Sequence, residues 1–164
     1  MRTIIHDLND EDLKRFIFDK DDKIISSLKC KKNCIGCFSC WIKHPKKCAL
    51  NDDFSNIVEY LKDSDELIII SKNRYGCYSS STKRVLERCI GYVLPYFTIR
   101  MNEIHHQTRY DKDLKFTSYF YGDVDEADRN TIEKLVRANA VNLNASEYKV
   151  NYIDDIKEIE ECIL

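Results

Sequence analysis

The sequence predicts an α/β fold in which helices cover a doubly wound, five-stranded parallel sheet. Strand-like and helix-like segments alternate along the chain, which is the pattern of parallel strands joined by helical crossovers. The run Leu67-Ile68-Ile69-Ile70 contains no polar residue, as expected of a central strand buried on both faces. The 164 residues suffice for one domain, 1–164, and we find no linker or internal repeat.

Composition and charge disfavour two classes of partner. The formal net charge of −2 provides no basic excess for nucleic acid. No apolar run approaches the roughly 20 residues of a membrane span, and the N-terminus lacks the pattern of a signal peptide. We therefore expect a cytoplasmic protein. In a reducing compartment, clustered cysteines are more often metal ligands or redox groups than disulfides.

The individual elements follow from apolar periodicity and from cap residues. We expect strands over 2–8, 23–28, 66–71, 115–121 and 147–152. We expect helices from Asp52 or Asp53 through Leu61, over 81–94 before Pro95, over 125–143 and over 154–163. The polar connection 9–18 leaves room only for a short helix around Leu13 and Phe16, and the segments 96–100 and 102–110 carry no clear pattern.

The strongest chemical signal is a group of cysteines in an irregular loop, residues 30–51. Cys34, Cys37, Cys40 and Cys48 follow the spacing C-x2-C-x2-C-x7-C, and Gly36 permits the tight backbone that converging thiolates require. An iron–sulfur cluster such as [4Fe–4S] is one interpretation and zinc is another. A redox-active thiol pair, or simple burial of small apolar side chains, remains open as well.

Other candidates carry weaker signals. Tyr75 and Tyr78 flank Gly76 in the loop after the isoleucine-rich strand, and we expect them to line a site for a flat ligand. The adjacent His105 and His106 point to opposite faces of a strand, which argues against a shared metal. The remaining candidates are His44 inside the cysteine loop, Cys30 as a spare thiol, Cys77 near the expected ligand site, the core thiols Cys89 and Cys162, and the run 79–82 as a helix cap or anion site.

Several of these motifs together resemble one family. The run from Cys34 through Trp41 to Cys48, followed by Asp52-Asp53, resembles the flavodoxin-fold NAD(P)H-dependent FMN reductases, near the branch of the iron–sulfur flavoproteins. The segments Arg74-Tyr75-Gly76, Lys83 to Arg88 and Tyr119 to Gly122 resemble the same family over roughly residues 30–145. The resemblance implies a flavodoxin-like three-layer sandwich with helices on both faces of the sheet.

The resemblance also implies a cofactor and its contacts. Arg74, Tyr75, Gly76, Cys77 and Tyr78 would lie beside the ring of FMN, and Tyr121 and Gly122 on its other side. Cys34, Cys37, Cys40 and Cys48 would bind a cluster. The function implied is an FMN-dependent oxidoreductase or electron-transfer protein with a nicotinamide donor, assembled as a homodimer or homotetramer.

One segment departs from the family pattern. The family holds the FMN phosphate in a loop rich in Ser, Thr and Gly after the first strand, whereas residues 6–12 contain none of these and carry four acidic side chains. The first helix is accordingly expected to be short or missing. The alternative function is a degenerate flavodoxin-like protein without FMN, acting as a thiol or metal sensor or as an interaction module.

Overall fold

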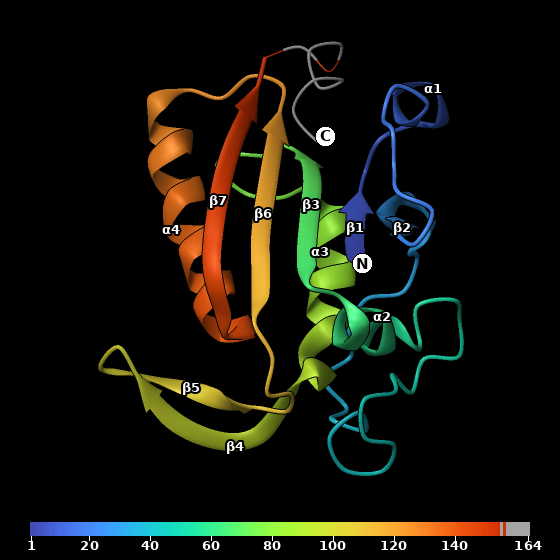
Figure 1. Ribbon diagram of the computed structural model, residues 1–164, viewed down its shortest axis with the longest axis vertical. Helices are drawn as coiled ribbons and strands as arrows, with labels where there is room; N and C mark the ends of the chain where they lie inside the picture. The colour runs from blue at the N-terminus through green and yellow to red at the C-terminus, as the bar shows by residue number, and fades with distance from the viewer. Residues whose placement is uncertain (155, 157–164) are drawn as a thin grey trace.

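A computed structural model describes residues 1–154 and 156 (Figure 1). Its parallel strands are β1 (Arg2–His6), β2 (Lys23–Ser26), β3 (Glu66–Lys72), β6 (Leu114–Tyr121) and β7 (Ala145–Ile153). They form a five-stranded sheet in the order β2-β1-β3-β6-β7, which confirms the predicted flavodoxin-like α/β architecture. The helix expected over 154–163, with Cys162, falls almost entirely outside the described residues.

The apolar run of β3 serves both faces of the sheet. Leu67 and Ile69 belong to one buried cluster, and Ile68 and Ile70 belong to the other, as the alternation of a strand requires. The first cluster is covered by α2 (Ile57–Asp63), α3 (Ser80–Glu87) and α4 (Glu126–Leu143). These helices thus form one outer layer of the sandwich.

The opposite face is covered in part by the connection between β1 and β2. Its helix α1 (Asp10–Leu13) has four residues, which confirms that the first helix is short. Phe16 is 7% exposed and packs with Ile4 and Ile70 on this face. Within the described chain, no helix is both long and apolar enough to cross a membrane.

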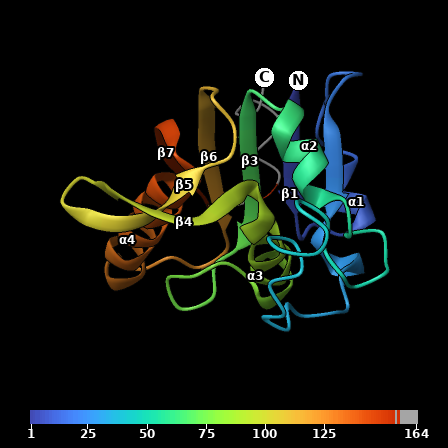
Figure 2. The same ribbon diagram turned by 90° about the horizontal axis from the view of Figure 1, so that it is seen from below.

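The prediction of one helix over 81–94 was wrong. The α-helix ends at Glu87 and is followed by a 3₁₀ helix, η2 (Arg88–Tyr92), and a strand, β4 (Val93–Arg100), which contains Pro95. Among the described residues, the strand β4 pairs only with the antiparallel strand β5 (Glu103–Thr108), so that the proline costs no hydrogen bond of a central strand. This hairpin lies across the amino ends of the parallel strands (Figures 1 and 2).

The start of α2 also differs from the prediction. The helix begins at Ile57, and neither Asp52 nor Asp53 is its cap. Asp52 instead accepts a hydrogen bond from the backbone N–H of Phe54 at 3.1 Å and pairs with Arg88. The predicted apolar face is nevertheless correct, because Phe54, Ile57, Val58 and Leu61 are all buried.

Candidate functional site

Two loops begin side by side at the carboxyl edge of the sheet. The neighbouring strands β3 and β6 end in register, with Lys72 opposite Tyr121. The backbone N–H of Asn73 donates to the carbonyl of Tyr121 at 2.9 Å, which joins the first residue of one loop to the end of the other strand. Ligands of doubly wound sheets bind beyond this edge. The structure therefore brings together the two segments that the sequence predicted to flank a ligand.

The loop after β3 contains a tight turn. Arg74 and Cys77 exchange backbone hydrogen bonds of 2.9 and 3.1 Å, and Tyr75 and Gly76 between them have φ angles of +55° and +74°. A Cβ atom on Gly76 would lie 2.6 Å from Cβ of Thr131 on α4, so only glycine fits there. The turn packs Gly76 against α4 and leaves Tyr75 95% exposed.

Asn73 fixes this turn and was missed in the sequence. Its side-chain carbonyl accepts from the N–H of Gly76 at 3.0 Å. Its amide donates to the carbonyl of Asp123 at 2.7 Å and to the carboxylate of Asp128 at 2.5 Å. The available signal was a polar residue directly after a buried strand. Asn73 thereby connects both loops and the first turn of α4.

Of the other residues predicted to contact a flavin, Tyr78 lies in the core, and Cys77, Tyr121 and Gly122 lie at the carboxyl edge. Tyr78 is 3% exposed, its hydroxyl lies 3.1 Å from that of Ser118, and burial raises its pKa to about 12. Its ring stacks on Phe120 in the core. Cys77 and Tyr121 are half-buried, and Gly122 has a φ of +89°. The candidate edge is thus formed by Arg74 to Cys77 with Tyr121 and Gly122, whereas Tyr78 lies in the core beneath them.

The loop after β1 makes hydrogen bonds to itself and to β3. The buried carboxylate of Asp7 accepts from the N–H of Lys72 at 3.0 and 3.1 Å and from the hydroxyl of Ser71 at 3.0 Å. The side chain of Asn9 accepts from the N–H groups of Glu11 and Asp12 at 3.0 and 2.8 Å. The amides that a phosphate would need at the start of α1 are therefore already bonded to a side chain of the protein.

His6 lies at the end of β1 and is 1% exposed. Burial lowers the pKa of its imidazole, and Nδ1 accepts from the N–H of Leu8 at 3.2 Å. The proton of the neutral ring is therefore assigned to Nε2, which has no hydrogen-bond partner among the described residues. The imidazole provides no positive charge for an anion at this edge.

The four cysteines of the motif converge on one small hollow. Cys34, Cys37, Cys40 and Cys48 line a space of about 60 Å³ together with Arg88. Burial raises the pKa of Cys40, and Cys48 adds to the effect. The seven described cysteines are all free, and no group of three or more Cys, His, Asp or Glu side chains in residues 1–154 and 156 is placed to hold a metal.

Arg88 is the charged residue of this region, and its side chain is 0% exposed. Its guanidinium donates two hydrogen bonds to the carboxylate of Asp52, at 2.8 and 2.6 Å, and lies 3.7 Å from the sulfur of Cys30. Arg88 follows Ser80, at the start of α3, by eight residues, or about 12 Å of helix rise. The cysteine hollow beside Arg88, the first residue of η2, is therefore about 12 Å from the carboxyl edge along the direction of α3.

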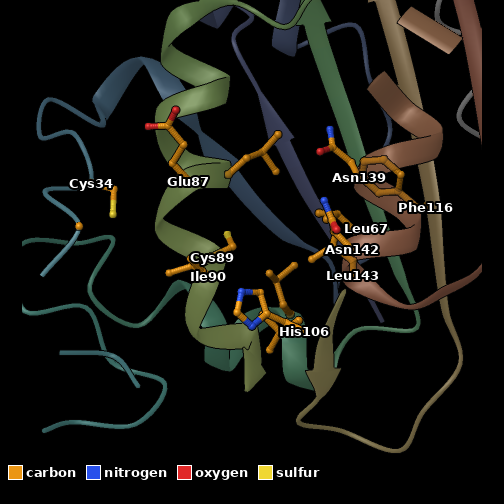
Figure 3. Close-up of a pocket in the computed structure, with 14 residues that line it drawn as sticks. Cys34, Leu67, Glu87, Cys89, Ile90, His106, Phe116, Asn139, Asn142 and Leu143 are labelled. Carbon is orange, nitrogen blue, oxygen red and sulfur yellow. The ribbon is translucent and has the colours of Figure 1, made fainter. Parts of the chain in front are cut away.

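A larger cavity of about 520 Å³ lies toward the amino ends of β3 and β6 (Figure 3). Leu67 and Phe116 line it from the sheet, and Asn142 of α4 and His106 of β5 line it from the sides. The sequence did not predict this cavity. As predicted, the two adjacent histidines diverge: His105 contacts Asn142, and the ring of His106 packs at a tilt against that of Trp41.

Comparisons with known proteins extend the assignment of the fold. The sequence matches no model of a protein family and no curated protein. Among solved structures, the azoreductase AzrA is 9% identical, with a TM-score of 0.57 over 96% of this chain and 88% of that one. An FMN-dependent NADH-azoreductase from Bacillus anthracis, solved with FMN, is 12% identical, with a TM-score of 0.54 over 98% and 96%. This likeness shows that the chain has a flavodoxin-like fold.

Proposed function

We propose that the protein is a flavin-dependent oxidoreductase of the NAD(P)H:FMN reductase type. The observation that carries the proposal is the adjacency of the turn Arg74–Cys77 and the segment Tyr121–Gly122 at the carboxyl edge of a flavodoxin-like sheet. The similar structures include an FMN-dependent NADH-azoreductase, which supports a flavin and a nicotinamide donor as ligands. The flavin would supply the redox chemistry, and the chain would supply its binding and orientation.

The described residues fit the two ends of FMN unequally. At the ring end, the exposed Tyr75 and the half-buried Tyr121 lie on the two neighbouring segments of the carboxyl edge. Their aromatic rings offer surface on which a flavin ring can pack. At the phosphate end, the amides of Glu11 and Asp12 are capped by Asn9, and exposed carboxylates surround them. A phosphate dianion does not fit this loop. We therefore assign flavin binding to the ring end of the site.

A comparison of two flavins tests this proposal. Riboflavin has the ring of FMN without its phosphate, so we expect the protein to bind riboflavin at least as tightly as FMN. The double variant Asp10→Asn, Glu11→Gln removes two exposed carboxylates near the start of α1. It is expected to raise the affinity for FMN by about 3- to 10-fold and leave that for riboflavin unchanged. Flavin fluorescence titration at low and at physiological salt measures both affinities.

The ring contact has its own control. Tyr75→Ala is expected to weaken both flavins by about 3- to 10-fold, because the exposed ring adds only stacking. Tyr148→Ala is the matched control, since Tyr148 is also exposed but lies on the edge strand β7. The proposal is contradicted if the wild type binds neither flavin. It is also contradicted if Tyr75→Ala and Tyr148→Ala lose flavin affinity equally. A flavin-loaded protein should then oxidise a nicotinamide donor.

A second candidate function is a thiol or metal sensor without a flavin. The observation that favours it is the convergence of Cys34, Cys37, Cys40 and Cys48 on one hollow beside the buried Arg88. The thiolate is the form of cysteine that binds soft metals and reacts with oxidants. In this reading, the fold would hold the cysteine loop, and the carboxyl edge would have no ligand.

Anaerobic reconstitution with zinc, or with iron and sulfide, tests the second candidate. If this second function is correct, the wild type takes up the metal or cluster and Cys37→Ser does not, since Cys37 is exposed and its replacement leaves the core intact. Cys77→Ser is the control, since Cys77 lies in the loop after β3 and not beside the hollow. Unchanged uptake in Cys37→Ser, or no uptake by the wild type, rules out ligation by these four thiols.

A further inference from the structure

The hairpin of β4 and β5 has two chemically different faces. Residues directly opposite each other in an antiparallel pair lie on the same face. One face therefore carries Phe97 with His106 and Ile99 with Ile104. The other face carries the more polar pairs Thr98 with His105 and Arg100 with Glu103.

The polar face contacts the body of the protein. Nδ1 of His105 lies 3.0 Å from the side-chain oxygen of Asn142 near the end of α4. The guanidinium of Arg100 donates to the side-chain oxygen of Asn144, the residue that ends the same helix. The side chain of His105 is only 9% exposed. These contacts fix the orientation of the hairpin relative to α4 (Figure 1).

The apolar face is therefore turned to the solvent. Phe97 is 65% exposed, Ile99 and Ile104 are each 75% exposed, and Met101 in the connecting turn is 72% exposed. This is the reverse of a usual surface ribbon, which buries its apolar face and exposes its polar one. Isolated exposed apolar side chains are common, but a contiguous group on one face indicates an interaction surface.

The apolar surface continues beyond the hairpin through a row of rings in contact with one another. The ring of His106 lies 4.9 Å from that of Phe97 and 4.8 Å from that of Trp41, and Trp41 in turn stacks on Phe38 at 5.2 Å. Phe38 is 48% exposed. His106 also lines the 520 Å³ cavity (Figure 3), so one side chain belongs to both the apolar face and the cavity wall.

We propose that this hairpin face binds the same face of a second copy of the chain. The face carries no Asp, Glu, Lys or Arg, so two copies related by a twofold axis bring no like charges together. At roughly 100–150 Å² for each exposed large apolar side chain, Phe38, Phe97, Ile99, Met101 and Ile104 offer about 500–750 Å² per copy. A standard stable interface uses about 800 Å² per partner.

The proposed contact also stabilises the hairpin itself. A two-stranded ribbon is marginal in water unless a further layer covers its apolar face. Two such ribbons packed face to face provide that layer for each other. The interface lies at the amino ends of the parallel strands, away from the carboxyl-edge loops, so the dimer stands independently of the flavin proposal.

A pair of opposite charges tests the interface directly. We expect sedimentation velocity of the full chain to show a dimer, and Ile104→Glu and Ile104→Lys each to weaken it about 100-fold or more, because each buries like charges. An equimolar mixture of the two variants is expected to recover dimers, since the two charges then attract. A merely misfolded variant would not be rescued by mixing. Circular dichroism verifies that each variant is folded.

A matched control separates this face from general surface hydrophobicity. Ile17 is 68% exposed and lies outside the hairpin, so Ile17→Glu is expected to leave the dimer intact. A monomeric wild type at high micromolar concentration overturns the proposal, and so does equal dissociation by Ile17→Glu. A monomer that binds lipid vesicles through Ile104 would assign the face to a membrane instead. Riboflavin uptake, measured on the same variants, should be unchanged.

Discussion

Replacing Asp52 by asparagine is expected to lower the free energy of unfolding by about 3–5 kcal/mol. The side chain of Arg88 is 0% exposed, and the carboxylate of Asp52 accepts two hydrogen bonds from its guanidinium. An asparagine of the same size keeps one acceptor oxygen but removes the counter-charge, and a buried charge without a partner is costly. Urea unfolding followed by circular dichroism measures the change.

The effect of Asp52→Asn should also depend on pH. The hydrogen bonds from Arg88 hold the pKa of Asp52 below its usual value. The unfolded chain therefore takes up a proton at about pH 3.9, before the folded chain does. The stability that Asp52 provides is complete above that pH and is lost as the pH falls through the lower folded pKa. We expect the difference between the wild type and Asp52→Asn to be constant from pH 5 to 7 and to narrow below about pH 4.

Two further variants define the contribution of the pair. Arg88→Met removes the buried charge and leaves Asp52, which is 21% exposed, in contact with water, so its cost should be smaller. Asp65→Asn is the surface control, because the Asp65 side chain is 76% exposed and should contribute little. If Asp52→Asn changes stability no more than Asp65→Asn does, the pair does not hold the cysteine loop on η2.

The sheet was predictable because its strands are buried on both faces. The run Leu67 to Ile70 is short and wholly apolar, which favours a buried strand over a buried helix. The segments around it alternate as helical crossovers require. Such patterns depend only on which residues must avoid water. They need no knowledge of which distant segment covers each face.

The hairpin was not predictable, because its backbone depends on a contact with a distant segment. Cys89, Ile90 and Val93 have the spacing of a helix face, and they line the 520 Å³ cavity as a helix face would. The backbone there is set by a distant residue, because the indole N–H of Trp41 donates to the carbonyls of Ile90 and Val93. The apolar periodicity of a segment gives no information about its contact with a residue about 50 positions away in the sequence.

At the candidate site, too, local spacing was predictable from the sequence and contacts between distant residues were not. The cysteine spacing predicted one group of four, and they do line one hollow. The spacing did not predict Arg88 beside them, since its partner Asp52 precedes it by 36 residues. Tyr78 was expected to face a ligand because it follows Gly76 in a loop, but the loop is short enough that Tyr78 already reaches Phe120 in the core.

The second large effect is expected at Trp41, the only tryptophan of the chain. Trp41→Ala should lower the free energy of unfolding by about 2–4 kcal/mol, because the half-buried ring packs against the core and joins three segments. Its indole N–H donates to the carbonyls of Ile90 and Val93 at 3.0 and 2.9 Å, and its ring contacts that of His106 of β5 at a tilt. Trp41→Phe keeps an aromatic ring and loses both hydrogen bonds, so about 1–2 kcal/mol is expected.

Amide hydrogen exchange locates the effect of Trp41→Ala within the chain. The indole connects the cysteine loop to the beginning of β4, so exchange should accelerate both in residues 38–48 and in the hairpin, whereas β3 should be unaffected. If only residues 38–48 exchange faster, the hairpin is held by α4 alone, through Arg100 with Asn144 and His105 with Asn142. Faster exchange in both segments shows instead that one side chain couples the cysteine hollow to the proposed dimer face, because His106 belongs to that face and its ring contacts that of Trp41.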